Sequence, residues 1–298
     1  MNILLLGTRG AGKTTLMHSM YGYFQTPREG LTITADSGHD KLMDGYRGIM
    51  KGIYPNADNQ RKKYQMALKY CDEKIFDFSW IDYYGGIYED NYNASEEDLK
   101  KLQKDILNSD GLICFFDSSQ YHKNNDYFLQ TIQALGQIFV HIKKVFPVSF
   151  IVTKSDLLSQ PMYKSTLRAP LEPIIGSISR NGHICGSLFQ SSCGRTFRNV
   201  DTPLFFMLIF GVILKAKMEY KEIEERRTNL SKRSIWKDIA DWADSRLNGY
   251  GTDYEILNRR IDDYNKIVGF QNDAIKRMAS RLENAIIFPD NIREDLFD

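Results

Sequence analysis

The chain has 298 residues, and its 39 Lys and Arg residues against 38 Asp and Glu residues leave a formal net charge of +1. With 42% hydrophobic and 26% charged residues, the composition excludes collagen-like, low-complexity and disordered chains. The near-neutral balance gives no reason to expect a nucleic acid or an anionic membrane as the main partner.

The cysteines and the apolar runs indicate the compartment. The four cysteines form no C-x-x-C pair and are too scattered for a disulfide framework. The N-terminal sequence lacks the basic flank and the cleavage site of a signal peptide. The longest apolar run, Leu204 to Leu214, is about half of the roughly 20 residues that a membrane-spanning helix needs. We therefore expect a cytoplasmic protein without a transmembrane segment.

Strand-like and helix-like segments alternate over the first two thirds of the chain. Several strand-like segments are nearly continuous apolar runs, as expected for strands buried on both faces of a parallel sheet. The predicted strands are Asn2–Leu6, Gln65–Tyr70, Ile75–Ile81, Leu112–Phe116, Val148–Thr153 and His183–Phe189. The predicted helices are Lys13–Phe24, Ser95–Asn108, Tyr127–Phe146 and Pro203–Arg227. This alternation predicts an α/β fold with a mostly parallel, doubly wound sheet.

Two regions depart from a minimal fold of this class. Residues 30–64 form a long insertion, in which Leu31–Asp36 predicts a short strand and Lys41–Lys51 predicts a helix. Further along, the chain becomes charged and helical. The sequence therefore predicts an α/β domain over residues 1–227 and a helical C-terminal extension over residues 228–298.

A glycine-rich motif follows the first predicted strand. The segment from Gly7 to Thr14, GTRGAGKT, fits the phosphate-binding pattern G-x-x-x-x-G-K-[ST]. Glycines allow backbone N–H groups to curl around a phosphate, and the helix that follows points its positive end at the anion. The Lys13 ammonium can reach the β- and γ-phosphate oxygens, and the Thr14 hydroxyl can take one site on Mg²⁺. The predicted phosphate-binding residues are Gly7, Arg9, Gly10, Ala11, Gly12, Lys13, Thr14 and Thr15.

A second motif, Asp82-Tyr83-Tyr84-Gly85, follows the predicted strand Ile75–Ile81. A carboxylate at a strand end beside the phosphate loop can hold Mg²⁺ through a water, and a glycine N–H can sense a γ-phosphate. The pattern D-x-x-G is common by chance, so it supports a magnesium site here only because it stands at a strand end after the phosphate motif. We interpret Asp82 as a magnesium ligand and Gly85 as part of a catalytic centre.

A third motif, Thr153-Lys154-Ser155-Asp156, stands at the end of the predicted strand Val148–Thr153. An Asp carboxylate can accept hydrogen bonds from guanine N1–H and N2–H₂, which adenine does not offer. The Lys stem can lie over the flat base. We interpret Thr153, Lys154 and Asp156 as a guanine-binding group. The three motifs in this order, each at a predicted strand end, indicate a GTP site.

On GTRGAGKT, DYYG and TKSD, the sequence resembles the P-loop GTPases of the Ras-like, translation-factor-related (TRAFAC) class over about residues 1–220. The resemblance implies GTP or GDP with Mg²⁺ and a switch between the two nucleotide forms. It assigns phosphate binding to Gly10, Gly12 and Lys13. It assigns magnesium binding to Thr14 and Asp82, and guanine binding to Lys154 and Asp156.

Other parts of the chain refine this resemblance. The last family motif is S-A-K, in the loop after the sixth strand, and this chain has Ser191-Ser192-Cys193 there. The resemblance therefore assigns to Ser191 and Ser192 only a serine and a backbone contact with the nucleotide. The long insertion and the stretch Trp80–Gly86 look closer to bacterial GTPases of the "double-GTPase" kind than to small signalling GTPases.

Two departures from the family pattern concern hydrolysis. Family members place a threonine of the first switch on Mg²⁺, but Tyr54–Lys63 contains none. Thr32 and Thr34 are the nearest candidates, in a context that also fits a strand. Gly86 stands where many members carry a water-orienting glutamine, so we expect slow unaided hydrolysis. An arginine supplied by a partner accelerates such sites by about 10³–10⁵-fold, and Arg9 is either an internal source of that charge or a solvent-facing residue.

Three functional hypotheses follow, in order of preference. The first is a GTPase that hydrolyses GTP slowly and acts as a switch toward a protein effector or a second copy, through its switch regions and C-terminal helices. Its predicted catalytic residues are Lys13, Arg9, Asp82 and Gly85. The second keeps the nucleotide as a regulatory or structural ligand with little or no turnover. The third, an ATPase or nucleotide kinase, leaves Thr153–Asp156 unexplained, and the arginine-poor middle of the chain offers little of the substrate-binding arginine cluster and the lid that a kinase needs.

Overall fold

The sheet and its helices are described over part of the chain. The computed structural model describes residues 1–56, 61–82, 96–121, 126–158, 162–181, 183–193, 197–231, 253–282 and 285–288. The strands are β1 (Asn2–Gly7), β2 (Leu31–Ala35), β3 (Lys62–Tyr70), β4 (Glu73–Asp82), β5 (Gly111–Asp117), β6 (Phe146–Thr153), β7 (Ile184–Gln190), β8 (Ser192–Cys193), β9 (Phe197–Arg198) and β10 (Ile286–Phe288). The α-helices are α1 (Lys13–Tyr23), α2 (His39–Met50), α3 (Glu96–Asn108), α4 (Ser118–Tyr121), α5 (Asp126–Phe139), α6 (Lys164–Arg168), α7 (Glu172–Asn181), α8 (Thr202–Ser231) and α10 (Asp253–Ser280).

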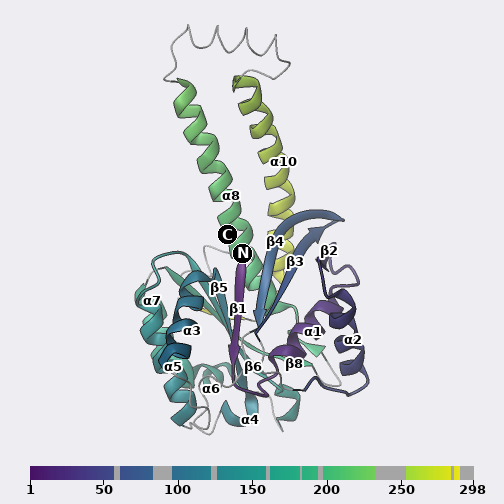
Figure 1. The fold of residues 1–298 in the computed structure, drawn as a ribbon, viewed down its shortest axis with the longest axis vertical. Coiled ribbons are helices and arrows are strands. Elements are labelled where there is room, and N and C mark those ends of the chain that lie inside the picture. Colours follow the sequence, from purple (N-terminus) through teal and green to yellow (C-terminus); the bar gives the residue numbers. More distant parts are fainter. Residues whose placement is uncertain are drawn as a thin grey trace.

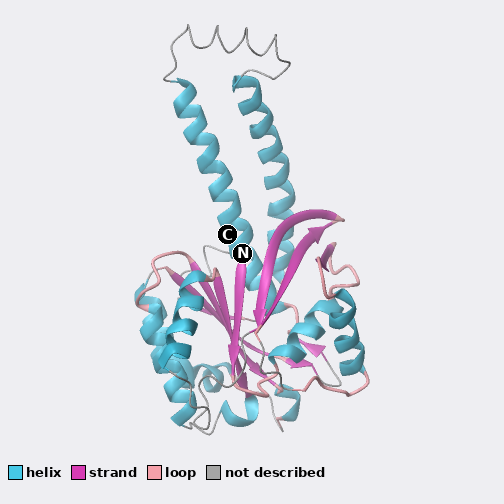
Figure 2. Ribbon diagram, viewed as in Figure 1, coloured by secondary structure: helices cyan, strands magenta, loops and turns pink. Residues whose placement is uncertain are grey.

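Eight of these strands form one sheet in the order β10-β7-β6-β5-β1-β4-β3-β2 (Figures 1 and 2). The five strands from β7 to β4 in this order are parallel. At one edge, β3 pairs antiparallel with β4, and β2 pairs antiparallel with β3. At the other edge, β10 pairs antiparallel with β7. The predicted α/β class with a mostly parallel sheet is confirmed, as are the six predicted strands and the strand and helix of the insertion.

β1 lies where the strand order reverses. Its parallel neighbours are β4 on one side and β5 on the other, although β1 precedes both in the chain. In open α/β sheets, ligands bind at the carboxyl ends of the strands beside such a reversal. The fold therefore directs the search for a site to the loop that follows β1.

The apolar core occupies both faces of the sheet. Along β1, Ile3 and Leu5 belong to one buried cluster, whereas Leu4 and Leu6 belong to the other, because successive side chains of a strand point to opposite faces. The first cluster includes residues of α1, α8 and α10, and the second includes residues of α3, α5 and α7. This two-sided burial explains why the central strands are continuous apolar runs.

α8 and α10 form a long antiparallel arm. Figure 1 shows the arm rising from the end of the sheet at which β1 begins, opposite the end at which β1 finishes. Ile223 and Leu257 form a small buried cluster of their own, with Ile261 packed against it. α8 runs without interruption through the predicted boundary at residue 227, and β10 returns the chain to the sheet after the arm.

One predicted helix is too long. The sequence pattern predicts a helix over Tyr127–Phe146, but α5 ends at Phe139 and Phe146 is already the first residue of β6. Pro147 follows Phe146, and a proline disfavours the helical conformation in the residue before it. The Phe146 amide instead donates to the carbonyl of His183 at 2.9 Å. Among the described helices, none combines the length and the apolar character that a membrane crossing requires.

Candidate functional site

The loop between β1 and α1 is a tight, glycine-dependent turn. Gly10 and Gly12 have φ values of 77° and 84°, the left-handed region that side chains other than glycine rarely adopt. The Ala11 amide donates to the Thr8 carbonyl at 3.2 Å, which closes the turn. Gly7 also has to be glycine, because an added Cβ would lie 2.7 Å from the Phe115 carbonyl oxygen.

Lys13 lies across this loop. Its ammonium donates to the carbonyl oxygens of Gly7 and Thr8, at 2.8 and 3.0 Å. The residue is 8% exposed and stands in the first turn of α1, where helical N–H groups point out of the helix end. An ammonium, a helix N-terminus and a curled backbone together form a site suited to a phosphate group.

A hydroxyl and a carboxylate meet beside the loop. Thr14 Oγ1 donates to Asp82 Oδ2 at 3.2 Å, and Asp82 is 7% exposed. The parallel register places Asp82, at the end of β4, opposite Leu5 near the end of β1. Hydroxyl and carboxylate oxygens are the ligands that Mg²⁺ prefers, so this pair fits the magnesium ion that the sequence motifs imply.

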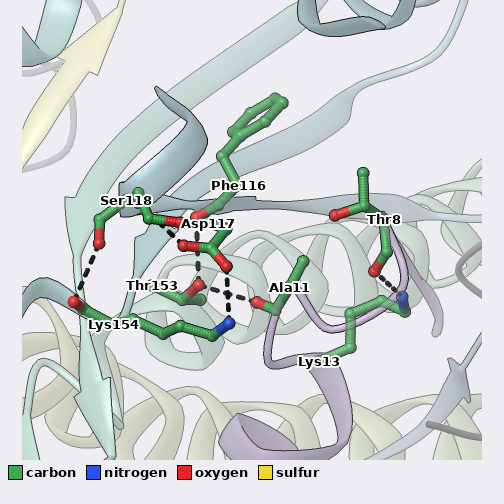
Figure 3. A network of polar contacts seen from close by, with 9 residues as sticks. Thr8, Ala11, Lys13, Phe116, Asp117, Ser118, Thr153 and Lys154 are labelled. Atoms are coloured by element: carbon green, nitrogen blue, oxygen red, sulfur yellow. Dashed lines mark hydrogen bonds and ion pairs between the residues drawn. The ribbon is translucent and has the colours of Figure 1, made fainter. Parts of the chain in front are cut away.

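Thr153, the last residue of β6, connects the loop between β1 and α1 to the neighbouring strand. Its hydroxyl lies 2.8 Å from the Ala11 carbonyl oxygen and 3.1 Å from that of Phe116 (Figure 3). Gly12 lies directly beside it, since a Cβ at Gly12 would be 3.6 Å from the Thr153 side chain. The first and third sequence motifs are therefore in direct contact.

Lys154 follows in a left-handed conformation, with φ at 56°. Its ammonium forms an ion pair with Asp117 Oδ2 at 2.6 Å, and its carbonyl accepts a hydrogen bond from Ser118 Oγ at 2.9 Å (Figure 3). Burial raises the pKa of Asp117, but hydrogen bonds from Lys154 and Ser119 outweigh burial, and the net shift is downward. These contacts hold the Lys154 ammonium and the Lys154 backbone carbonyl, so the stem between them forms a shelf beside the loop.

Asp156 is exposed in a short 3₁₀ helix, Ser155–Leu157, next to the segment that follows β7. The Ser191 carbonyl accepts from both the amide and the hydroxyl of Ser155, at 3.2 and 3.1 Å. Burial, together with the nearby Asp156 charge, raises the pKa of Cys193 to about 12 despite hydrogen bonds from Ser19 and Ser191. Ser191 and Ser192 are buried, and Ser191 Oγ donates to the Arg198 carbonyl.

Most predicted site residues converge at one end of the sheet, and two candidates do not. Thr32 and Thr34 lie in β2, where Thr34 pairs with Ala67, and Ala67 pairs in turn with Asp77. Asp77 precedes Asp82 by five strand residues, which is about 17 Å. The strand interpretation of Thr32 and Thr34 is therefore right, and their interpretation as magnesium ligands is wrong.

The remaining predicted residues lie at the edges of the site. Arg9 is exposed at the tip of the loop, and Thr15 is half-buried in the first turn of α1. Gly85 and Gly86 lie outside the described residues. Sequence reasoning missed Asp117 and Ser118, although the polar pair directly after the apolar run of β5 is the same kind of signal that identified Asp82.

No protein-family model and no curated protein matches the chain. Among solved structures, a GTP-binding protein from Sulfolobus solfataricus in complex with GDP is 15% identical, with a TM-score of 0.38 over 72% of this chain and 52% of that one. A mutation variant of SsGBP is 15% identical, with a TM-score of 0.40 over 72% of this chain and 55% of that one. The signal recognition particle receptor SRb-GTP/SRX complex from Chaetomium thermophilum is 15% identical, with a TM-score of 0.41 over 70% and 96%. This chain thus covers little more than half of the first two proteins, and likeness at this level transfers no residue roles to it.

Proposed function

We propose that this protein binds GTP and GDP with Mg²⁺, hydrolyses GTP slowly, and acts as a nucleotide-dependent switch toward a protein partner. The observation that carries the proposal is the contact between Thr153 and Ala11, which joins a phosphate-binding loop to a polar shelf suited to a base. A mononucleotide needs both parts at once, at opposite ends of one ligand. We place the chain among the P-loop GTPases of the TRAFAC class, near the bacterial double-GTPase kind.

The phosphate end of the nucleotide is assigned to the loop and to Lys13. The ammonium now rests on two backbone carbonyls, at 2.8 and 3.0 Å, and would exchange these neutral acceptors for phosphate oxygens. Hydrogen bonds between charged groups are roughly twice as strong as neutral ones, so this exchange favours the nucleotide. Thr14 and Asp82 would hold Mg²⁺, which would offset the negative charge of the phosphates.

The base end is assigned to Lys154 and Asp156, with the backbone near Ser191 and Ser192 as a further contact. The Asp117 ion pair holds the Lys154 stem in one position, so that a flat base can lie against it. The exposed Asp156 carboxylate can then accept from guanine N1–H and N2–H₂. Adenine offers a different edge, which is why we propose guanine.

Hydrolysis and switching are the further steps of the proposal. Lys13 would stabilise charge that develops on the γ-phosphate, and Arg9, exposed at the loop tip, is placed to add to it. Gly85 is the proposed γ-phosphate sensor. The arm formed by α8 and α10 and the segments around Asp82 are the proposed contacts with a protein partner.

The first experiment is a calorimetric titration of the nucleotide-free protein with GTP, GDP and ATP, each with Mg²⁺. We expect tight binding of both guanine nucleotides and none of ATP. Lys13→Ala should abolish binding. Asp156→Asn should weaken GTP by about 10²-fold, the loss expected for two charge-assisted hydrogen bonds, and should relax the preference toward xanthine nucleotides. Asp44→Asn, which alters an exposed carboxylate on α2, is the control. ATP binding as tight as GTP binding would refute the guanine assignment.

The second experiment separates a switch that hydrolyses from a module that only binds. Single-turnover hydrolysis of GTP is measured for the wild type and for Lys13→Ala and Arg9→Ala, with and without candidate partners. We expect slow turnover by the wild type, faster than hydrolysis of free GTP. Turnover equal to that of free GTP under all conditions would leave nucleotide binding in place and refute the hydrolase.

A further inference from the structure

A cavity of about 280 Å³ lies at the base of the arm, where the end of α10 meets the turn between α1 and β2. Three segments line it: the chain from Tyr23 to Leu31, the start of α8, and the last turns of α10. Three arginines reach the cavity from two of these segments, namely Arg28, Arg277 and Arg281. Such a convergence of like charges is costly unless anions balance it.

The turn that carries Arg28 is rigid. The amide and carbonyl of Arg28 both bond to Leu31, at 2.9 and 2.8 Å. Between them, Glu29 and Gly30 have φ values of 53° and 84°, the pattern of a two-residue type I′ turn. Glutamate is an unusual residue at a positive φ, and such strain is concentrated at functional sites. The turn thus fixes the backbone from which the Arg28 and Glu29 side chains project.

The three arginines differ in how firmly they are held. Arg281 binds Asp201 through Nε and Nη2, at 3.1 and 2.9 Å, and the Asp201 side chain is only 4% exposed. Arg277 lies 4.0 Å from Glu29 across half-exposed side chains, which is the outer limit of an ion pair. Arg28 rests on the Tyr23 ring, with Cζ 4.2 Å from the ring centre. Two of the three guanidinium groups can therefore turn toward a ligand.

The charge of the cavity favours an anion. Three arginines against Glu29 and Asp201 leave one positive charge, and Asp201 is already engaged by Arg281. Glu29 is exposed and can move into solvent when a stronger anion arrives. Arg28 and Arg277 would then face that anion with two positive charges. The planar fork of a guanidinium matches phosphate oxygens in pairs.

The remaining lining is apolar. Leu31 and Phe205 are only 1% and 2% exposed and close the back of the cavity, whereas the half-buried Tyr23 ring and the exposed Pro27 form the apolar floor that a ligand can reach. We propose that this cavity is a second ligand site, which takes a small organic phosphate whose phosphate group lies between Arg28 and Arg277 and whose apolar body lies on Tyr23 and Pro27. The site is distinct from the phosphate loop, since the loop precedes α1 and the cavity follows it, about 16 Å away along 11 helical residues.

The test is a calorimetric titration of the full chain with phenyl phosphate at low ionic strength. We expect millimolar or tighter binding to the wild type and to Lys13→Ala, because the phosphate loop does not contribute. Arg28→Gln and Arg277→Gln should each weaken binding at least tenfold. Arg47→Gln, which removes an exposed arginine of α2, should leave it unchanged. Far-ultraviolet circular dichroism checks that each variant is folded.

Inorganic phosphate is the second probe, and it should bind at least threefold more weakly than phenyl phosphate because it lacks the apolar body. Equal binding of the two probes would overturn the assignment of the apolar floor. Loss of phenyl phosphate binding in Lys13→Ala with retention in both arginine variants would place the ligand in the phosphate loop and overturn the proposal. Absence of binding to the wild type at 10 mM would overturn it as well.

Discussion

Asp117 governs the position of Lys154, and no sequence motif contains it. We expect Asp117→Asn to weaken binding of GDP about tenfold, because an amide cannot replace the charge-assisted bond of 2.6 Å to the Lys154 ammonium. Calorimetric titration measures the change. Asp110→Asn is the matched control, since Asp110 stands at the other end of β5 and also pairs with a lysine, Lys144, at 3.5 Å. Equal losses of GDP affinity in the two variants would show that the loss comes from removing any negative charge, and not from the position of Lys154.

His18 makes stability depend on pH. Burial, followed by the charges of Lys62 and Lys41, lowers the pKa of His18 to about 4. Between pH 6.5 and 4 the unfolded chain therefore takes up a proton that the folded protein does not, so stability falls with falling pH. The slope is about 1.4 kcal/mol per pH unit, or roughly 3 kcal/mol over this range. Above pH 6.5 both states are neutral at this residue and its contribution is constant.

Urea unfolding of the wild type and of His18→Leu at several pH values measures this term, because other titrating groups cancel in the difference. We expect the wild type to lose stability relative to the variant as pH falls from 6.5 to 4. His183→Gln, at an exposed position, is the control for the loss of a histidine. Parallel curves for wild type and His18→Leu would contradict the prediction.

Among the elements, the packing of α2 on α1 depends on two glycines, one on each helix. A Cβ at Gly22 would lie 2.1 Å from the Tyr46 ring, and a Cβ at Gly45 would lie 1.9 Å from His18 Nδ1. We expect Gly45→Ala to destabilise the protein by about 1–3 kcal/mol, as overpacking does. Gly176→Ala in α7 has open space around it, so it should stabilise by about 0.5–1 kcal/mol through helix propensity alone. Chemical denaturation measures both, and stabilisation by both would refute the packing argument.

The elements also show what periodicity can and cannot predict. Strands buried on both faces are continuous apolar runs, so the six central and neighbouring strands could be located from the sequence. β10 has three residues, too few for a periodic pattern, and its position depends on a contact with a residue far away in the sequence. Phe288 fills the space above Gly186, where a Cβ would lie 1.9 Å from the ring. This contact between Phe288 and Gly186 could not be predicted from the sequence, because only folding brings the two residues together.

The same distinction applies to the whole candidate site. Motifs that end strands could be predicted, because parallel strands bring their carboxyl ends to one edge. The contacts between motifs could not be predicted. The Thr153 hydroxyl meets Ala11 across 142 positions of sequence, and Asp117 meets Lys154 across 37. Likewise the magnesium assignment of Thr32 and Thr34 failed because register, which decides their distance from Asp82, is a property of the sheet.

At the scale of the whole molecule, the arm divides into two parts. Its base belongs to the main core through buried residues of both helices, such as Val212, Ala274 and Met278. Farther out, among the described residues, Ile223 and Leu257 form a separate buried cluster with Ile261 packed against it. We therefore propose that the α/β unit includes the base of the arm and β10, and that the outer arm is dispensable for folding.

Replacing residues 224–260 by a five-residue Gly/Ser linker tests this division. Packed helices lie about 8–10 Å apart, which such a linker spans between Ile223 and Ile261. We expect the shortened protein to keep cooperative unfolding and unchanged GDP binding, and to lose only the contacts of a partner that uses the arm.

Truncation after residue 284 is the contrasting variant. It removes β10 with the fully buried Phe288, at a cost of about 3–5 kcal/mol, and exposes the edge of β7. Loss of GDP binding in the linker variant would show instead that the outer arm stabilises the site from the opposite end of the sheet.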